Sequence, residues 1–142
     1  MIRRSILLDT VIDVVVRTVL VFAVFLLLSG HNAPGGGFVG GLVGGSALLL
    51  RYLTGGTDEV VGRVAPSPES LMSAGLALAV ITGAWSWLGG EPFLSNAFLN
   101  VELPLLGTVK TTSALPFDVG VFLVVFGVCL AIITSLGRER ST

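Results

Sequence analysis

The chain has 142 residues, of which 53% are hydrophobic and only 12% are charged. Soluble domains carry about 25% charged residues, and a small soluble domain leaves much of its surface in water, so this composition excludes an ordinary soluble globule. The net charge of -1 also argues against nucleic acid as a partner, because such binding needs a surplus of Lys and Arg. We therefore expect an all-α integral membrane protein whose apolar surface meets membrane lipid.

Four apolar segments are long enough to cross a bilayer. An 18-residue helix reaches about 27 Å at 1.5 Å per residue, close to the roughly 30 Å of hydrocarbon in a membrane. In chain order, the predicted spans are residues 6–28, 36–53, 71–88 and 119–136. The sequence thus predicts one membrane domain over residues 1–142, built from four transmembrane helices.

The segments between these spans differ in kind. Pro34 precedes three glycines and breaks the chain between the first two spans, and residues 54–66 read as a short linker. Asp118 is expected in the first turn of the fourth span, where a helix dipole favours an acidic group.

A long loop, residues 89–116, connects the third and fourth spans and is too broken by Gly and Pro to cross the membrane. Within it, Leu99–Leu103 and Thr108–Thr112 flank the turn-forming segment Pro104–Gly107. This pattern predicts a short β-hairpin outside the membrane, which needs a neighbour because a lone hairpin is only marginally stable in water.

The distribution of basic residues predicts the orientation. Four spans place both termini on one side, together with six arginines, whereas only Lys110 falls on the other side. Lys and Arg accumulate in cytoplasmic loops, so both termini are predicted to be cytoplasmic. Trp85 and Trp87 then lie at the outer interface, where amphipathic rings are enriched.

Glycine spacing is the strongest local pattern. Two glycine columns with a spacing of four residues open the second span, formed by Gly36, Gly40 and Gly44 and by Gly37, Gly41 and Gly45. Such small-residue faces let helix backbones approach closely in lipid. Packing within this chain and docking of another subunit both fit the pattern, and we expect the face to receive partner helices.

Asp13 and Arg17 place charges inside the first span. Their spacing of four residues puts them on one stripe of the helix, with Asp9 a further turn away, and the order Asp before Arg favours pairing. A guanidinium inside the membrane must face protein or water, and Asp13 is the expected partner of Arg17. A structural pair and a role in an ion path both remain open.

Two further residues are candidates for ion handling. His31 is the only histidine, and its unperturbed pKa near neutrality suits proton transfer, although a loop histidine is more often a structural hydrogen-bonding group. Asp118 has a similar alternative, since the helix dipole alone explains an acidic residue there. Asp13, Arg17, His31 and Asp118 are therefore the residues to test first.

The sequence contains no constellation typical of catalysis. A Cys/His cluster with metal spacing, a nucleophile–base pair and a dinucleotide fingerprint are all missing, and no lysine lies within a span. We expect no cofactor and no enzymatic activity. A self-sufficient homo-oligomeric channel or exporter and a membrane assembly factor remain alternatives to a transporter subunit.

The segment Gly30–Gly45, GHNAPGGGFVGGLVGG, resembles the B subunit of Mrp-type (Mnh) multisubunit sodium/proton antiporters. The segments LPLLG (Leu103–Gly107) and FDVGVFLVVFG (Phe117–Gly127) resemble the second block of that family. Chain length, the four-span layout and the order of both blocks agree as well. One departure is Lys110 in the predicted hairpin, where an acidic residue is common in the family.

The resemblance implies a small accessory subunit of a large complex in the bacterial cytoplasmic membrane, which exchanges external protons for internal sodium. Its partners would be the subunits of types A, C, D, E, F and G. In that family the proton-path lysines and glutamates belong to the large A and D subunits. The scarcity of membrane charge in this chain fits that division of labour.

Overall fold

The computed structural model describes residues 5–30, 35–64, 66–90, 98–103, 107–112 and 114–140. Two short strands form an antiparallel pair in which Phe98 lies opposite Thr112 and Leu103 lies opposite Gly107. In chain order, the elements of these residues are α1 (Ile6–Ser29), α2 (Gly37–Gly55), α3 (Thr57–Arg63), α4 (Pro68–Leu88), β1 (Phe98–Leu103), β2 (Gly107–Thr112) and α5 (Ala114–Arg140).

Local sequence explains where the helices begin. The hydroxyl of Ser5 accepts a hydrogen bond from the backbone N–H of Leu8 (3.2 Å), and Ser67 caps α4 in the same way, directly before Pro68. Gly36 and Gly56 precede α2 and α3 with φ values of 95° and 77°, a left-handed region that glycine adopts without strain.

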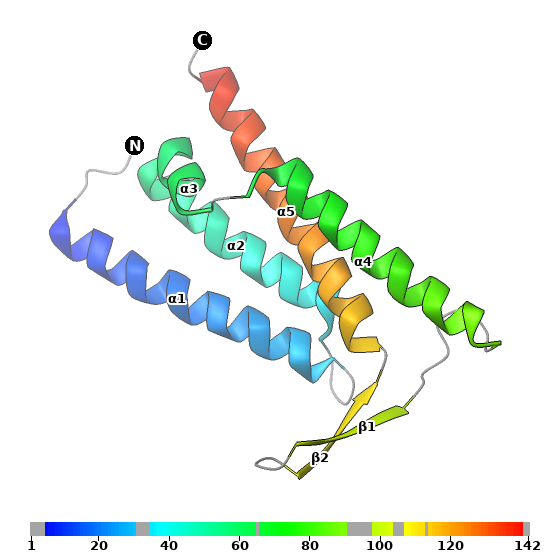
Figure 1. Cartoon of the computed structure of the whole chain (residues 1–142). Coiled ribbons are helices and arrows are strands. Elements are labelled where there is room, and N and C mark those ends of the chain that lie inside the picture. Colours follow the sequence, from blue (N-terminus) through cyan, green and yellow to red (C-terminus); the bar gives the residue numbers. More distant parts are fainter. Residues whose placement is uncertain are drawn as a thin grey trace.

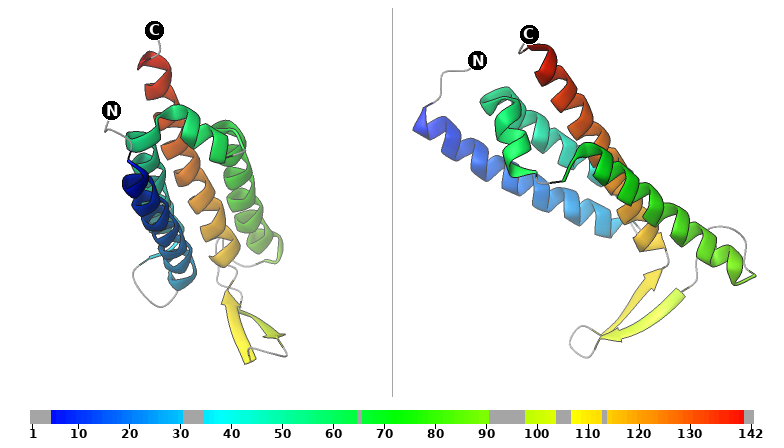
Figure 2. Two further views of the ribbon diagram at one scale, coloured as in Figure 1. Left: turned by 90° about the vertical axis from the view of Figure 1, so that its left-hand side faces the viewer. Right: turned by 45° about the horizontal axis from the view of Figure 1, so that its top comes forward.

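The four long helices stand side by side in the order α1, α2, α5, α4 (Figures 1 and 2). Within the described residues, α4 packs against α5 and against no other element, so α4 and α1 form the two edges of the row. A small core lies on each side of α2. Ile12, Val16 and Ala47 join α1 to α2, and a second cluster joins α2, α3 and α5 through Leu48, Val60, Leu130 and Ile133.

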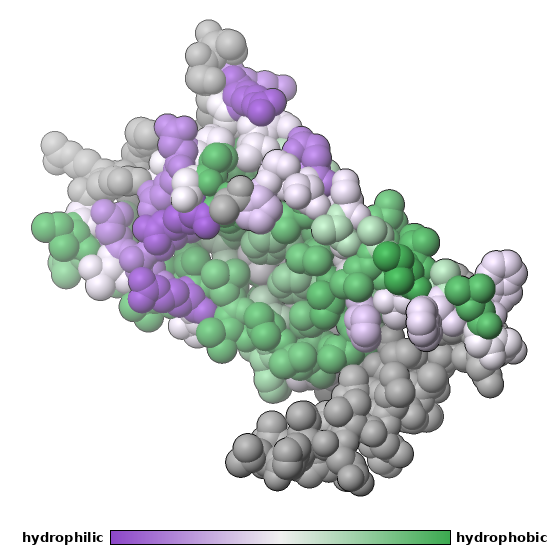
Figure 3. All heavy atoms as spheres, viewed as in Figure 1, coloured by the Kyte–Doolittle hydropathy of each residue, from purple (hydrophilic) through white to green (hydrophobic). Residues whose placement is uncertain are grey.

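The surface agrees with a membrane location. Hydrophobic side chains cover the helices in a broad band, and hydrophilic ones gather near the end that holds the first residues of α1 and the last of α5 (Figure 3). In the described part of the chain, α1, α2 and Ala114–Glu139 of α5 are each long and apolar enough to cross a membrane. A fourth crossing results if α3 and Pro68–Trp85 of α4, bent by 47°, count as one broken span.

Two boundaries differ from the sequence-based expectation. The segment 54–66 is not a simple linker, because it contains helix α3. Helix α5 begins at Ala114, five residues before the predicted fourth span, and takes in Pro116. A proline is tolerated there because the first N–H groups of a helix have no partner within it.

Candidate functional site

The glycine face of α2 is buried inside this chain. An added Cβ at Gly40 would lie 2.8 Å from the carbonyl oxygen of Ala23 in α1 and 3.3 Å from the Phe122 ring in α5. At Gly41 it would lie 2.8 Å from Cβ of Val125 in α5. Side chains at these positions would therefore push α2 away from its neighbours on both sides.

The remaining glycines of this face extend the same contacts along α5. Gly44 lies against the stacked rings of Phe122 and Phe126, and Gly45 lies against Cys129. Gly37 lies against the backbone of Asp118. The close-packing role predicted for these glycines agrees with the structure, but this chain's own α1 and α5 occupy the face. The expectation that partner helices dock there is wrong.

A second close contact joins α4 to α5. An added Cβ at Gly120 would lie 2.7 Å from the carbonyl oxygen of Gly75 and 2.8 Å from the backbone nitrogen of Ala79. Both are backbone atoms, so the contact can relax only by moving a whole helix. The small residues of the third predicted span therefore hold α4 on α5.

The strongest electrostatic feature is a network of ion pairs between α1, α2 and α3. Its centre is Arg51 of α2, which is only 7% exposed. One guanidinium nitrogen of Arg51 contacts Oδ1 of Asp13 in α1, and the other lies 3.1 Å from Oε1 of Glu59 in α3. Arg63 reaches both carboxylates, at 3.9 Å from Asp13 and 3.5 Å from Glu59.

Arg51 is thus the arginine in closest contact with Asp13, whereas the spacing along α1 predicts Arg17 as its partner. The Arg17 guanidinium lies 3.9 Å from Oδ2 of Asp13, at the limit of an ion pair, and its side chain is 76% exposed. In the sequence, Arg51 served only as one of the six arginines that predict the cytoplasmic side. The missed signal was a group of two basic and two acidic residues within 13 positions at and after the end of the second predicted span, next to a first span that carries Asp13: Arg51, Asp58, Glu59 and Arg63.

Asp118 lies in the second turn of α5, since that helix begins at Ala114 and has no acidic residue in its first turn. The expected position of Asp118 in the first turn of its own helix is therefore wrong. Its carboxylate instead faces the beginning of α2: an added Cβ at Gly36 would lie 3.7 Å from Oδ2 of Asp118. The N–H groups of the first turn of α2 point toward this end, so the dipole of α2 favours the charge.

Two predicted residues cannot be placed. His31 and Pro34 lie outside the described residues, between the end of α1 and Gly35. The described neighbours show how tightly α1 meets α2: the backbone N–H of Gly36 donates to the carbonyl of Leu26 (3.0 Å), and Gly30 lies against Gly36.

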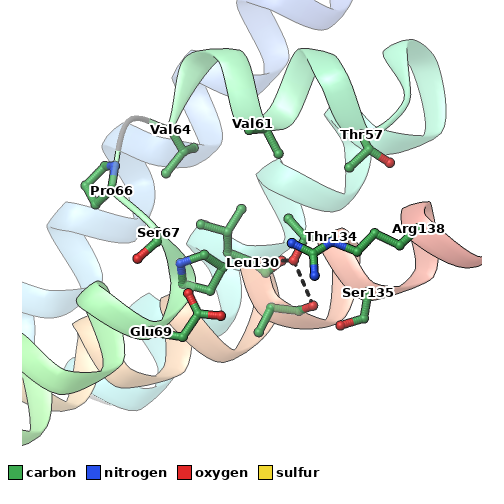
Figure 4. A pocket seen from close by; sticks show the side chains of 12 residues that line it. Thr57, Val61, Val64, Pro66, Ser67, Glu69, Leu130, Thr134, Ser135 and Arg138 are labelled. Carbon is green, nitrogen blue, oxygen red and sulfur yellow. Dashed lines mark hydrogen bonds between the residues drawn. The ribbon is translucent and has the colours of Figure 1, made fainter.

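A cavity of about 390 Å³ opens where α3, the start of α4 and the last turns of α5 meet. Figure 4 shows apolar side chains, among them Val61 and Leu130, beside the polar side chains of Ser67, Thr134 and Arg138. The Thr134 hydroxyl donates to the backbone carbonyls of Leu130 and Ala131. Across the described ranges no group of three or more His, Cys, Asp or Glu side chains is placed to hold a metal ion.

Comparison with known proteins adds to this geometry. Residues 7–131 match the family model described as a domain related to the MnhB subunit of Na+/H+ antiporter. The B subunit of a Na(+)/H(+) antiporter from Bacillus subtilis is 42% identical over 137 residues, covering 96% of both chains. The protein of the same name from Alkalihalophilus pseudofirmus is 40% identical over 136 residues, covering 96% of this chain and 94% of that protein.

One similar solved structure is a chain of the Mrp complex from Dietzia sp. DQ12-45-1b. It superposes with a TM-score of 0.77 at 34% identity and covers 93% of this chain. The present chain corresponds to only 14% of that chain, so there the same fold is one segment of a much longer polypeptide.

Proposed function

The chain belongs to the family of domains related to the MnhB subunit of Na+/H+ antiporters, and from this membership we propose that it is the small B-type subunit of a multisubunit sodium/proton antiporter. The observation that carries the proposal is the end-to-end match with single-chain relatives that are named as antiporter B subunits. The partners we propose are the A, C, D, E, F and G types of subunit, with membrane lipid around them.

The distribution of charge supports an architectural contribution. Residues 38–50, 70–88 and 119–137 of α2, α4 and α5 contain no Asp, Glu, Lys, Arg or His. The charges of the ion network lie at one end of α2, and Asp118 lies at the other. Proton and ion paths through membrane proteins are typically marked by Asp, Glu, His, Lys or Arg side chains, and these three segments contain none of them.

A secondary contribution to an ion route would involve Asp13, Arg17, His31 or Asp118. The test neutralises each residue in the complete antiporter and measures sodium/proton exchange in inverted membrane vesicles. Exchange that persists with the complex intact in all four variants would exclude such a route. Loss of exchange from an intact complex in one variant would identify its residue as part of the path.

For the topology we propose four crossings with both termini in the cytoplasm and the β1–β2 segment outside. The α3–α4 pair then forms one broken span. In support, the first residues of α1 and the last of α5 lie at the same end of the molecule, opposite to the strands (Figure 2). In a Cys129→Ala background, Arg138→Cys should react with an impermeant thiol reagent only from the cytoplasmic side, and Lys110→Cys only from outside.

The decisive experiment for the function is purification through a tag on this chain. A B-type subunit should bring down the other antiporter subunits in a fixed ratio. Antiporter that is purified through a tag on another subunit and lacks this chain would instead indicate an assembly factor. Conduction by the chain reconstituted alone would indicate a self-sufficient channel.

A further inference from the structure

The exposed side of α1 carries a stripe with the spacing of a helix–helix contact. Seven exposed residues form it, and we call them the Arg17 stripe: Ile6, Thr10, Val14, Arg17, Val21, Val24 and Leu28. Neighbouring members are three or four residues apart, which is the spacing found where two helices pack side by side. The helices of this chain pack against another side of α1, through Ile12, Val16, Ala23 and Leu27.

Arg17 lies inside the membrane wherever the two membrane boundaries fall along α1. The helix has 24 residues from Ile6 to Ser29. An 18-residue crossing can therefore begin only between positions 6 and 12, and each such crossing contains residues 12–23. Arg17 is then at least about 7 Å along the helix axis from either end of the crossing.

Among the described residues, Asp13 is the one carboxylate within ion-pair distance of Arg17, and it is shared with other arginines. Asp13, the carboxylate that the Arg17 guanidinium approaches at 3.9 Å, is already in contact with Arg51 and within reach of Arg63. These five groups, three arginines with Asp13 and Glu59, carry a net charge of +1, and the surplus is on the exposed side. Charged side chains at membrane depth face protein or water and pair with an opposite charge.

On the basis of the proposed function, we propose that the Arg17 stripe is the docking surface for a transmembrane helix of another antiporter subunit, which places an Asp or Glu carboxylate opposite Arg17. β-Branched residues of the stripe on both sides of Arg17, Val14 and Val21 among them, offer an apolar surface that can pack around the ion pair. A second copy of this chain does not fit. A twofold axis along the membrane normal would set Arg17 against Arg17 at the same depth, and like charges repel.

The first test is photo-crosslinking in native membranes with the complete complex. A benzoyl-phenylalanine replaces Val21, one turn from Arg17 on the stripe, and the matched control carries it at Ile81, an exposed apolar residue of α4. We expect Val21 to give one discrete adduct with a companion subunit, in a membrane segment that holds an Asp or Glu. Adducts with lipid only, with a second copy of this chain, or with a segment lacking a carboxylate would overturn the proposal.

The second test uses the charge. Arg17→Gln should lower the amount of the crosslinked companion that co-purifies by between about threefold and about twentyfold, the range of polar contacts between membrane helices. Arg17→Lys should restore part of it, and Arg17→Glu should be rescued by Arg in place of the partner's carboxylate. Wild-type co-purification of the Gln variant would contradict the proposal.

The two tests separate this inference from the proposed function. If no antiporter subunit co-purifies with the unaltered chain, the proposed function itself fails. If the complex forms but Val21 meets only lipid, the subunit assignment stands and the docking surface is wrong.

Discussion

The substitution Gly40→Ala measures how tightly α2 is held between its neighbours. The new Cβ would lie 2.8 Å from the carbonyl oxygen of Ala23 and 3.3 Å from both the backbone nitrogen of Leu27 and the ring of Phe122. Carbon–oxygen contacts normally begin at about 3.3 Å, so α1 and α2 must separate by about 0.5 Å. Phe122 of α5 lies on the other side of α2, so the helix cannot simply shift away from α1.

The expected cost follows from two opposing terms. Overpacking of this kind costs about 1–3 kcal/mol, whereas replacing glycine by alanine within a helix gains about 1 kcal/mol. Gly62 of α3 supplies a matched control, because among the described residues nothing beyond its own stretch of helix lies within 4 Å of an added Cβ. Gly62→Ala gains the same helix propensity without the contact, so the two variants should differ in stability by about 1–3 kcal/mol.

The assay is titration of each purified variant with SDS, followed by far-UV circular dichroism, which gives the free energy of unfolding. We expect Gly40→Ala to unfold at a lower SDS fraction than Gly62→Ala. Equal stability of the two variants, within about 0.5 kcal/mol, would refute the packing argument.

Three other substitutions test the remaining contacts. Arg51→Ala leaves two carboxylates without their shared cation and should lower the free energy of unfolding by about 3–5 kcal/mol. An immunoblot should then show loss of the chain from membranes, and equal loss for Arg138→Ala, an exposed arginine, would contradict a special role of Arg51. Asp118→Asn should lower stability by about 0.3–1 kcal/mol, the value of a charge at a helix N-terminus, measured by the same SDS titration; an unchanged midpoint would contradict the contact with α2. Gly120→Leu should raise hydrogen exchange in α4 alone, since α4 packs only on α5 within the described residues; a rise throughout α1 and α2 would contradict the row arrangement.

Much of the helical framework was predictable from the sequence, because in lipid the choice is restricted by backbone hydrogen bonding. The predicted span 6–28 coincides with α1 to within one residue, and 36–53 to within two residues of α2. The first residues of α5 were missed because Pro116 was assigned to the end of the loop 89–116, although a helix accepts proline in its first turn.

The partners of the charged residues were not predictable in the same way. Spacing along one helix correctly places Arg17 one turn from Asp13, but it cannot show that Arg51, 38 positions away in the sequence, contacts the same carboxylate. The glycine columns were recognised as a packing face, but their pattern is the same whether the occupant belongs to this chain or to another. Asp118 shows the same limit, since the helix end that it faces is that of α2.

The amino-acid sequence alone was enough to establish that this protein has membrane-length apolar helices, that one of them carries a close-packing glycine face, and that its charges are concentrated near one end. These properties follow from composition and from spacing within single helices. The tertiary structure was needed to show that α1 and α5 fill the glycine face, that Arg51 is the centre of the ion network, and that Arg17 is left exposed. Those outcomes depend on which helices are neighbours, and neighbours are set by packing between segments that are distant in the sequence.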